Sequence, residues 1–337
     1  MNPTIDWKRF AEMIRSASTI LLTAHQRPDG DCFGSEIAMK CILEKLGKEV
    51  FVLNPHPVPP TLAFLDENKV LRGLKEASME ERARIGHVDL ILVLDTSSWT
   101  QLADIGPLFK ASPAKKMVLD HHHKGDDIGA ERFVDSNAEA TGALVVQAAE
   151  ALNVPLDREI AEAAFVAIAT DTGWFRFPSV TSETYRTVAK LIDAGVVPAD
   201  IYREIYEQES FGRIRLIGRT LAQTESHFDG RVMFTRIMQE DLRLAGALPS
   251  DTEDIINMTL QVHGSKVAVL VSELKDGTFK ISFRSRCAVD CSRLAAQFSG
   301  GGHKQAAGAS SDKPFEETKE TLLVAVGRAL SELTNDV

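Results

Sequence analysis

The order of apolar and polar residues in the first half of the chain predicts strands that alternate with helices. Residues 7–14 place apolar side chains at the i, i+3, i+4, i+7 spacing of an amphipathic helix. The apolar run 18–24 is typical of a strand buried on both faces, and it ends in a polar loop, 25–31, with a proline and a glycine. A helix from about 33 to 46 and a strand over 48–54 complete a βαβ unit.

Two further apolar strands, 90–98 and 115–123, end in acidic or histidine residues. Helical patterns run over about 139–153 and 158–170. We therefore expect an α/β domain with a doubly wound, mostly parallel sheet over 1–190. Ligands of such sheets bind at the carboxyl ends of the strands, so the polar clusters that follow the strands are expected to converge on one site.

The second half predicts a connector and a smaller domain. Residues 191–226 are helical and charged, and 227–337 are expected to form a smaller α/β domain with a mixed sheet. The elements expected there are a strand at 228–238, a helix near 251–262, two strands joined by a hairpin turn at 275–277, a glycine-rich turn at 299–310 and a helix at 314–333.

Composition places the chain among ordinary globular proteins. It has 337 residues, 44% of them hydrophobic and 26% charged, which favours two domains and excludes a mostly disordered chain. No apolar run approaches the roughly 18 residues of a membrane-spanning helix, so no membrane partner is expected. The start, MNPTIDWKRF, has charges where a signal peptide needs an apolar core. With only four cysteines, these features predict a cytoplasmic protein without a disulfide scaffold.

The net charge of the chain bears on which nucleic acids or anions it could bind. The formal charge of −10 argues against a protein that coats long duplex nucleic acid. Residues 271–310 nevertheless hold six Lys and Arg against three Asp and Glu. This segment includes SFRSR and SGGGHKQAAG, in which arginines suit bidentate phosphate recognition and glycines allow a backbone nest for an anion. In isolation such a glycine run is only a flexible turn.

The polar clusters of the first domain have the composition of a metal site. Carboxylates mixed with imidazoles suit Mn²⁺ or Mg²⁺ better than a structural zinc, which prefers thiolates. A single Asp after a strand is often just a turn former or a helix cap, but so many at strand and helix ends favour a common site. The candidates are His25, Asp29, Asp31, Asp95, Asp120, His121, His122 and Asp171.

Four segments resemble, in order and spacing, the motifs of the DHH phosphoesterase superfamily: HQRPDGD, VLDTSS, LDHHH and ATDTGWFRF. SFRSR with GGGHKQAAG resembles the DHHA1 domain that follows in one branch of it. The resemblance covers essentially the whole chain. Within this superfamily, the length of the chain is most similar to that of the oligoribonucleases that are also 3′-phosphoadenosine 5′-phosphate (pAp) phosphatases.

The resemblance implies roles for the metal-site residues. Two Mn²⁺ ions are implied, with Mg²⁺ or Co²⁺ as alternatives. One ion would be held by His25, Asp29 and Asp95, and the other by Asp31, Asp95, His121 and Asp171. Asp95 would bridge them, His122 would face the scissile phosphate, and Asp120 would orient an imidazole.

The resemblance also implies that the second domain grips the substrate. The expected contacts are Arg284, Ser285, Gly301, Gly302 and His303, with Arg286 on the same strand face but at a different depth. Self-association is expected from the family likeness. The aromatic residues Trp174, Phe175 and Phe177 follow Asp171 closely in the sequence and could stack on a nucleobase. For at least two of them we expect packing in the core instead.

The implied function is a Mn²⁺-dependent two-metal phosphodiesterase. It would degrade short oligoribonucleotides to mononucleotides and remove the 3′-phosphate of pAp. Two alternatives stay open: a phosphodiesterase for cyclic or linear signalling dinucleotides, and a nucleotide-binding regulator without catalysis. Substitution of Asp95 separates enzyme from regulator, because a two-metal enzyme loses turnover whereas a regulator can retain binding.

Overall fold

The computed structural model describes residues 5–66, 69 and 71–334. The chain divides into two compact units between Gln208 and Glu209. The division falls within the segment 191–226 that we expected as a connector. Of the two helices there, α9 (Pro198–Tyr206) belongs to the first unit and α10 (Phe211–Ala222) to the second.

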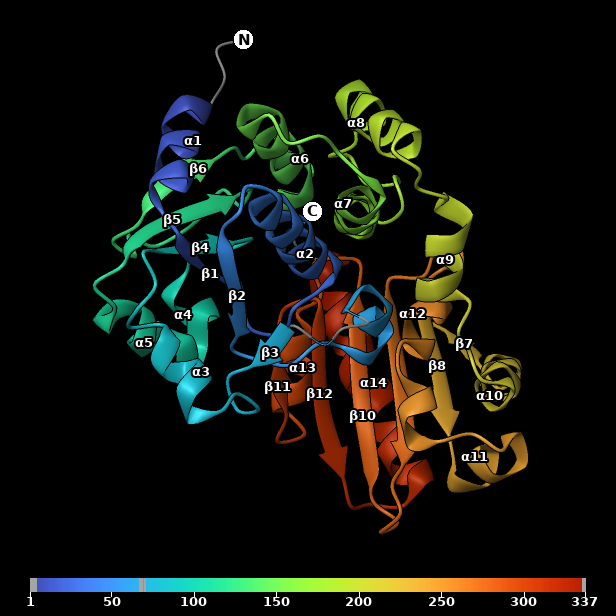
Figure 1. The fold of residues 1–337 in the computed structure, drawn as a ribbon. Helices are drawn as coiled ribbons and strands as arrows, with labels where there is room; N and C mark the ends of the chain where they lie inside the picture. The colour runs from blue at the N-terminus through green and yellow to red at the C-terminus, as the bar shows by residue number, and fades with distance from the viewer. Residues whose placement is uncertain (1–4, 67–68, 70, 335–337) are drawn as a thin grey trace. The chain divides into compact units, whose positions relative to one another are not determined.

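The first unit is built on a six-stranded sheet with the order β3-β2-β1-β4-β5-β6, in which every pairing is parallel (Figure 1). The strand order reverses between β1 and β4, which makes this the switch point of a doubly wound sheet. The strands are β1 Thr19–Thr23, β2 Glu49–Asn54, β3 Leu71–Gly73, β4 Leu90–Leu94, β5 Lys115–Asp120 and β6 Glu131–Val134.

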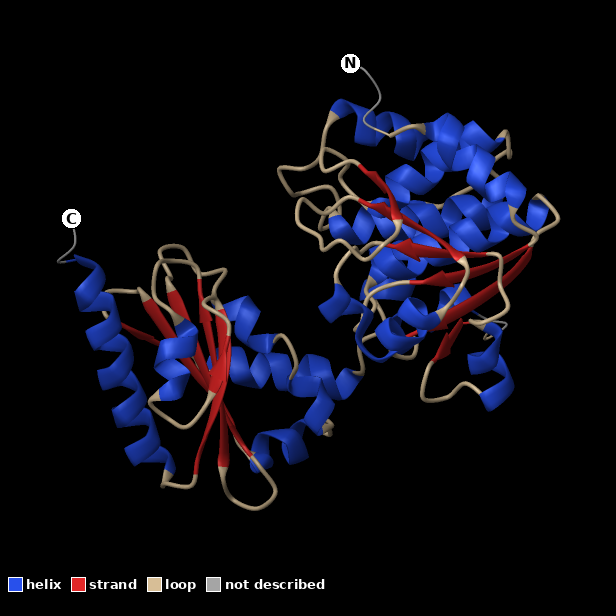
Figure 2. Ribbon diagram, turned by 90° about the vertical axis from the view of Figure 1, so that its left-hand side faces the viewer, coloured by secondary structure: helices blue, strands red, loops and turns tan. Residues whose placement is uncertain are grey.

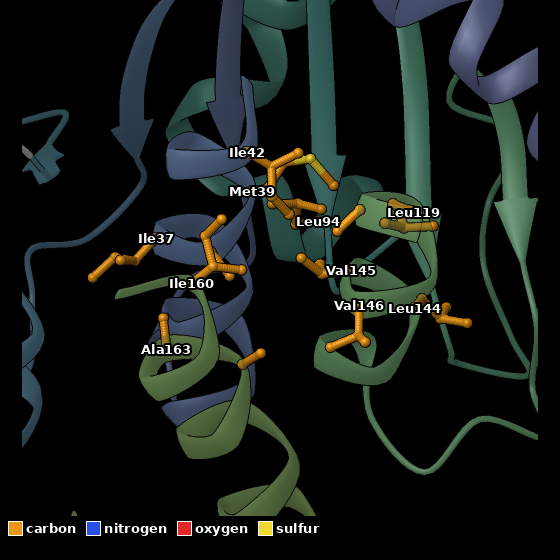
Figure 3. Packing of buried hydrophobic residues seen from close by; sticks show 14 of the residues in the cluster. Ile37, Met39, Ile42, Leu94, Leu119, Leu144, Val145, Val146, Ile160 and Ala163 are labelled. Atoms are coloured by element: carbon orange, nitrogen blue, oxygen red, sulfur yellow. The ribbon is translucent and has the colours of Figure 1, made fainter. Parts of the chain in front are cut away.

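Helices cover both faces of this sheet, and successive strand residues alternate between two cores. Leu92 of β4 belongs to the core between the sheet and α2, α6 and α7. Its neighbour Val93 belongs to the core on the opposite face, with α4 and α5. Figure 3 shows part of the first core. The helices are α1 Trp7–Ser16, α2 Gly30–Lys45, α3 Met79–Arg84, α4 Trp99–Leu102, α5 Gly106–Ala111, α6 Thr141–Leu152, α7 Arg158–Asp171 and α8 Ser182–Asp193, with 3₁₀ turns at Pro60–Asp66 and Ala103–Ile105.

The second unit holds a mixed six-stranded sheet with the order β11-β12-β10-β9-β8-β7, in which only β8 and β9 pair in parallel. Figure 2 shows the strands of both units in red and the helices beside them in blue. One face packs on α13 and α14, and the other on α10, α11 and α12. The elements are β7 Glu225–His227, β8 Val232–Ile237, α11 Gln239–Ala245, a 3₁₀ turn at Pro249–Thr252, α12 Ile255–Thr259, β9 Val267–Glu273, β10 Phe279–Ser285, α13 Cys291–Ala296, β11 Gly301–Gly302, β12 Ala306–Ser311 and α14 Phe315–Thr334.

The fold class is confirmed: an α/β unit with a parallel sheet and a second unit with a mixed sheet. The expected helix near 251–262 was too long: α12 has five residues and begins only after Asp254, which adopts a left-handed φ of 60°. The helix expected from about 33 begins earlier, at Gly30, since Asp29 caps it. Within the described ranges, no helix combines the length and the apolar character needed to cross a membrane.

Candidate metal centre

The predicted convergence of polar clusters is present at the carboxyl ends of β1, β4 and β5, which are neighbours in the sheet. His25 follows β1, Asp95 follows β4, and His121 follows β5 directly. α2 begins one residue after Asp29, and α7 ends at Asp171. The helices are therefore as important as the strands in bringing the ligands together.

The first group of possible ligands consists of His25, Asp29 and Asp95, whose ligand atoms lie within 4.8 Å of one another. Nε2 of His25 is 3.3 Å from Oδ2 of Asp95 and 3.7 Å from Oδ1 of Asp29. Two atoms that each lie about 2.1 Å from one ion are separated by roughly 3.0–3.4 Å in octahedral or tetrahedral geometry. The spacing of His25 and Asp95 falls in this range and that of His25 and Asp29 is about 0.3 Å longer, so the group needs only a small contraction to place its ligand atoms on one cation.

The second group consists of Asp31, His121 and Asp171. Nε2 of His121 is 3.7 Å from Oδ2 of Asp31 and 3.6 Å from Oδ2 of Asp171. The same nitrogen is 3.6 Å from Oδ1 of Asp95, whose Oδ2 faces His25 of the first group. Asp95 thus presents one carboxylate oxygen to each group, which is the arrangement of a bridging ligand.

Both histidines hold their outer ring nitrogen against a backbone carbonyl. Nδ1 of His25 lies 2.8 Å from the carbonyl oxygen of Gln26, and Nδ1 of His121 lies 3.2 Å from that of Ala138. A proton on Nδ1 leaves the lone pair of Nε2 free, which is how metal-binding imidazoles are commonly oriented.

Two buried carboxylates of the ligand groups, Asp31 and Asp95, are held by residues at the start of α6. Oδ2 and Oδ1 of Asp31 accept hydrogen bonds from the amides of Thr141 (2.7 Å) and Gly142 (2.8 Å). The hydroxyl of Thr141 donates to Oδ1 of Asp95 over 2.9 Å, and that of Ser35 donates to Asp31. These contacts fix the carboxylates before any ligand binds, which reduces the cost of organising a metal site.

The electrostatics indicate an excess of buried negative charge. Burial raises the pKa of Asp31 well above its ordinary value, and the charges of Asp95 and Asp171 raise it further. Burial also raises the pKa of Asp171, against a lowering by the His121 charge and with a smaller additional rise from the Asp95 charge. At His25, burial is outweighed by hydrogen bonds to Asp29 and Asp95, which raise its pKa to about 11. Divalent cations would compensate this charge.

The backbone at Asp95 is strained. Its φ of 60° lies in the left-handed region that residues other than glycine rarely adopt, at a cost of roughly 1–3 kcal/mol. Such strain persists only where the surroundings impose it, and here the conformation lies at the end of β4, at the carboxylate that faces both His25 and His121.

His122 forms a third group of possible ligands with Asp95 and His121, and it also pairs with Asp120. Nδ1 of His122 is 2.8 Å from Oδ1 of the fully buried Asp120, whose Oδ2 accepts a hydrogen bond from Ser97. The His122 side chain is 52% exposed, and the bond to Asp120 raises its pKa. With Nδ1 engaged, Nε2 is the nitrogen available to a bound molecule. His122 also lies near Asp95, with Nδ1 3.7 Å from Oδ1.

The donor set fits a pair of hard divalent cations. The described residues of the three groups comprise four carboxylates, three imidazoles and no thiolate, and Asp95 belongs to two of the groups. Sequence reasoning missed the residues that hold these ligands, above all Thr141, Gly142 and Ser35. The Thr-Gly pair at the start of the predicted helix 139–153 was the available signal.

The candidate residues of the second unit lie at one end of three neighbouring strands. In the register, Arg284 of β10 pairs with Ala306 of β12, next to the pair formed by Gly302 of β11 and Ala307. His303 is exposed in the turn between β11 and β12, where its backbone pairs with Ala306. The structure thus brings this set together at one end of these three strands.

The expected glycine-rich turn is in fact partly a strand. Gly301 and Gly302 form β11, and a side chain at Gly300 would meet the carbonyl oxygen of Gly308 at 2.1 Å. Close strand approach therefore accounts for part of the glycine run.

Three of the candidate contacts have local hydrogen-bond partners. The hydroxyl of the buried Ser285 lies within hydrogen-bond distance of the carbonyl oxygen and the amide of Cys287. The guanidinium of Arg286 donates to the carbonyl of Leu260. Arg284 is half-buried and donates to the carbonyl of Phe283 from one of its nitrogens.

Comparison with known proteins agrees with this architecture. The model of the DHH family, N-terminal domain, matches residues 19–168, and that of the DHHA1 domain matches 242–332. The chain is 30% identical, over 95% of its length and 93% of the relative's, to the bifunctional oligoribonuclease and PAP phosphatase NrnA of Thermus thermophilus. It is 27% identical to the protein of the same name from Bacillus subtilis, over 89% of this chain and 92% of that one.

A solved structure shows the same fold over nearly the whole chain. It is the crystal structure of an exopolyphosphatase-related protein from Bacteroides fragilis, with a TM-score of 0.81 and 26% identity. The similarity covers 97% of this chain and 95% of that chain.

Proposed function

The chain belongs to the DHH family of phosphoesterases with a DHHA1 domain, and on this premise we propose that it is a Mn²⁺-dependent phosphodiesterase acting through two metal ions. Its proposed substrates are short oligoribonucleotides, which it degrades to mononucleotides, and pAp, from which it removes the 3′-phosphate. The names of the two NrnA relatives support these substrates.

The observation that carries the proposal is the shared carboxylate of Asp95. Its two oxygens face His25 on one side and His121 on the other, at 3.3 and 3.6 Å. This geometry favours two ions close together, which is the arrangement that serves in-line attack at phosphorus. A single structural ion would not require a bridging ligand.

When bound, two divalent cations supply an acidified water as nucleophile and offset the charge that develops on the phosphoryl oxygens. We assign His122 as the residue that donates a proton from Nε2 to a phosphate oxygen or to the leaving group. Asp120 holds the imidazole at Nδ1 and stabilises its charged form, while Ser97 holds Asp120. Thr141 keeps the Asp95 carboxylate in place.

In the second unit, we assign Arg284, Gly301, Gly302 and His303 as contacts to the nucleotide. Their gathering at one end of three neighbouring strands and the local excess of positive charge support an anionic ligand. Ser285 and Arg286 remain candidates, but a role for either requires exchange of the local hydrogen bonds that they make.

The test is a substrate panel with Mn²⁺ and with a chelator. It compares a 5′-labelled RNA dinucleotide, pAp and a cyclic dinucleotide. The proposal predicts metal-dependent conversion of the RNA dinucleotide to mononucleotides and of pAp to adenosine monophosphate, with little turnover of the cyclic compound. Cleavage of the cyclic compound alone would assign the protein to dinucleotide signalling, and binding without turnover of any compound would indicate a regulator.

A further inference from the structure

The turn that follows α7 carries aromatic side chains next to the metal centre. It begins directly after Asp171, a member of the second ligand group, and contains Trp174, Phe175 and Phe177. The metal-centre chemistry described above uses none of these rings. The three rings differ in how they pack. Two of them contact the core, and the third leaves half of its residue accessible to a ligand.

Two of the rings are anchored in the core. Trp174 lies edge-on to Phe165, with centroids 5.7 Å apart, and Phe175 lies 5.9 Å from the same ring. Phe165 is a fully buried residue of α7, and Tyr202 and Tyr206 of α9 pack against Trp174 from outside. The expectation that core packing accounts for at least two of the three aromatics is consistent with these contacts.

Phe177 is different, because 50% of it is exposed. Its ring lies over Gly173, where a β-carbon would meet the ring atoms Cζ and Cε1 at 2.5–2.6 Å. One side of the ring thus rests on the backbone, and half of the residue remains accessible. Gly173 is two residues from Asp171, and two residues span at most about 7 Å. The Cα atom of Gly173, on which the ring rests, therefore lies within about 7 Å of the Cα atom of that ligand.

The turn holds this ring in a fixed position. The amides of Arg176 and Phe177 both donate to the carbonyl of Thr172, and the guanidinium of Arg176 donates to the carbonyl of Gly173. Trp174 and Phe175 adopt left-handed φ values of 59° and 63°, which cost roughly 1–3 kcal/mol each. Strain of this kind concentrates at functional sites.

We infer that Phe177 is a stacking platform for a nucleobase of the substrate whose phosphate is bound at the metal centre. The inference rests on the proposed function and adds a positioning residue to it. A half-exposed ring beside a phosphate-binding centre suits a flat aromatic base, and the exposed guanidinium of Arg176 adds positive charge for a neighbouring phosphate. Such stacking tolerates any base, as an enzyme for mixed short oligonucleotides requires.

The test compares Phe177→Ala and Phe177→Trp with the wild type on an RNA dinucleotide and on analogues that lack one base. We expect Phe177→Ala to raise KM roughly 5- to 150-fold, the effect of losing one stacked base, with kcat changed less than about twofold. Phe177→Trp should restore KM. For the analogue that lacks the stacked base, Phe177→Ala and the wild type should give the same KM. The control is Phe211→Ala, an exposed ring of α10, which should change nothing.

Three results for Phe177→Ala would overturn the inference: a KM that rises equally for the dinucleotide and for both analogues, an unchanged KM for the dinucleotide, or a decrease in kcat alone. A wild type that turns over no RNA dinucleotide would refute the proposed function instead. In that case a titration with a dinucleotide that contains fluorescent 2-aminopurine decides the inference. Stacking on Phe177 predicts quenching that Phe177→Ala abolishes and Phe211→Ala preserves, and equal quenching in all three proteins would contradict it.

Discussion

Nδ1 of His122 lies 2.8 Å from Oδ1 of Asp120, a carboxylate that is completely buried behind it. The same oxygen accepts a hydrogen bond from the His122 amide, so both the ring and the backbone of His122 are fixed to one atom. This pairing leaves only Nε2 for a bound phosphate, and it stabilises the protonated imidazole.

Asp120→Asn should therefore lower kcat about 10- to 100-fold while metal binding is retained. Hydrogen bonding to Asp120 is the main cause of the raised pKa of His122, and the loss of the negative charge lowers it. The alkaline limb of the pH–rate profile, where His122 loses its proton, should then move to lower pH. Asp229→Asn, at an exposed carboxylate of the second unit, is the control, and an unmoved alkaline limb in Asp120→Asn would contradict the assigned role.

The first and second ligand groups predict a metal stoichiometry. Equilibrium dialysis followed by elemental analysis should give two Mn²⁺ per chain for the wild type. His25→Ala should reduce this to about one, because only the first group loses a ligand. His87→Ala removes an exposed imidazole outside both groups and should bind two ions. A wild type that binds no Mn²⁺ would exclude the metal centre.

Glu36 gives a prediction about stability and pH. Burial raises its pKa to about 8, although Asn54 donates a hydrogen bond to it. The folded protein therefore holds this proton more tightly than the unfolded chain does. The contribution to the free energy of unfolding is complete below about pH 4.5 and declines as pH rises to 8, at most by about 1.4 kcal/mol per pH unit.

Glu36→Gln cannot lose a proton at this position. Urea unfolding of the metal-free proteins at pH 5, 6.5 and 8 should show the wild type becoming progressively less stable relative to Glu36→Gln. Parallel stability curves for the two proteins would show that Glu36 does not titrate in this range.

The close packing of α2 on α7 predicts the effect of a single methyl group. A β-carbon at Gly34 would lie 2.3 Å from the carbonyl oxygen of Ala163. Gly34→Ala should destabilise the protein by roughly 1–3 kcal/mol. It should also weaken Mn²⁺ binding, because these helices carry Asp31 and Asp171.

Gly218→Ala is the matched control, since a β-carbon at this exposed position in α10 meets no atom within 4 Å. It should leave metal binding unchanged and stabilise the helix by about 0.5–1 kcal/mol. Thermal unfolding and metal titration of both variants check the prediction, and a Gly34→Ala protein as stable as Gly218→Ala would contradict it.

The candidate ligands could be predicted from the sequence because strand and helix ends fixed their places. The run LILVLD identifies a buried strand that ends at Asp95, and parallel strands bring such ends to one edge. The sequence pattern does not predict the left-handed backbone conformation of Asp95, because tertiary contacts impose it.

The supporting contacts and the second unit were less predictable. Thr141 donates hydrogen bonds to Asp31 and Asp95, which are 110 and 46 residues away in the sequence. A local sequence pattern cannot predict contacts between residues so far apart. The glycine run was ambiguous for another reason. A nest for an anion and a strand in close contact with its neighbour both require residues without side chains, and only the register shows that Gly301 and Gly302 pair with β12.

The central claim is that Asp95 serves a metal centre that hydrolyses phosphodiesters. The most direct measurement is turnover of a 5′-labelled RNA dinucleotide by the wild type and by Asp95→Asn, with Mn²⁺ and with a chelator, after circular dichroism has shown both to be folded. We predict Mn²⁺-dependent mononucleotide release by the wild type and a decrease of about a thousandfold or more in Asp95→Asn. Wild-type turnover by Asp95→Asn, or undiminished turnover in chelator, would contradict the account.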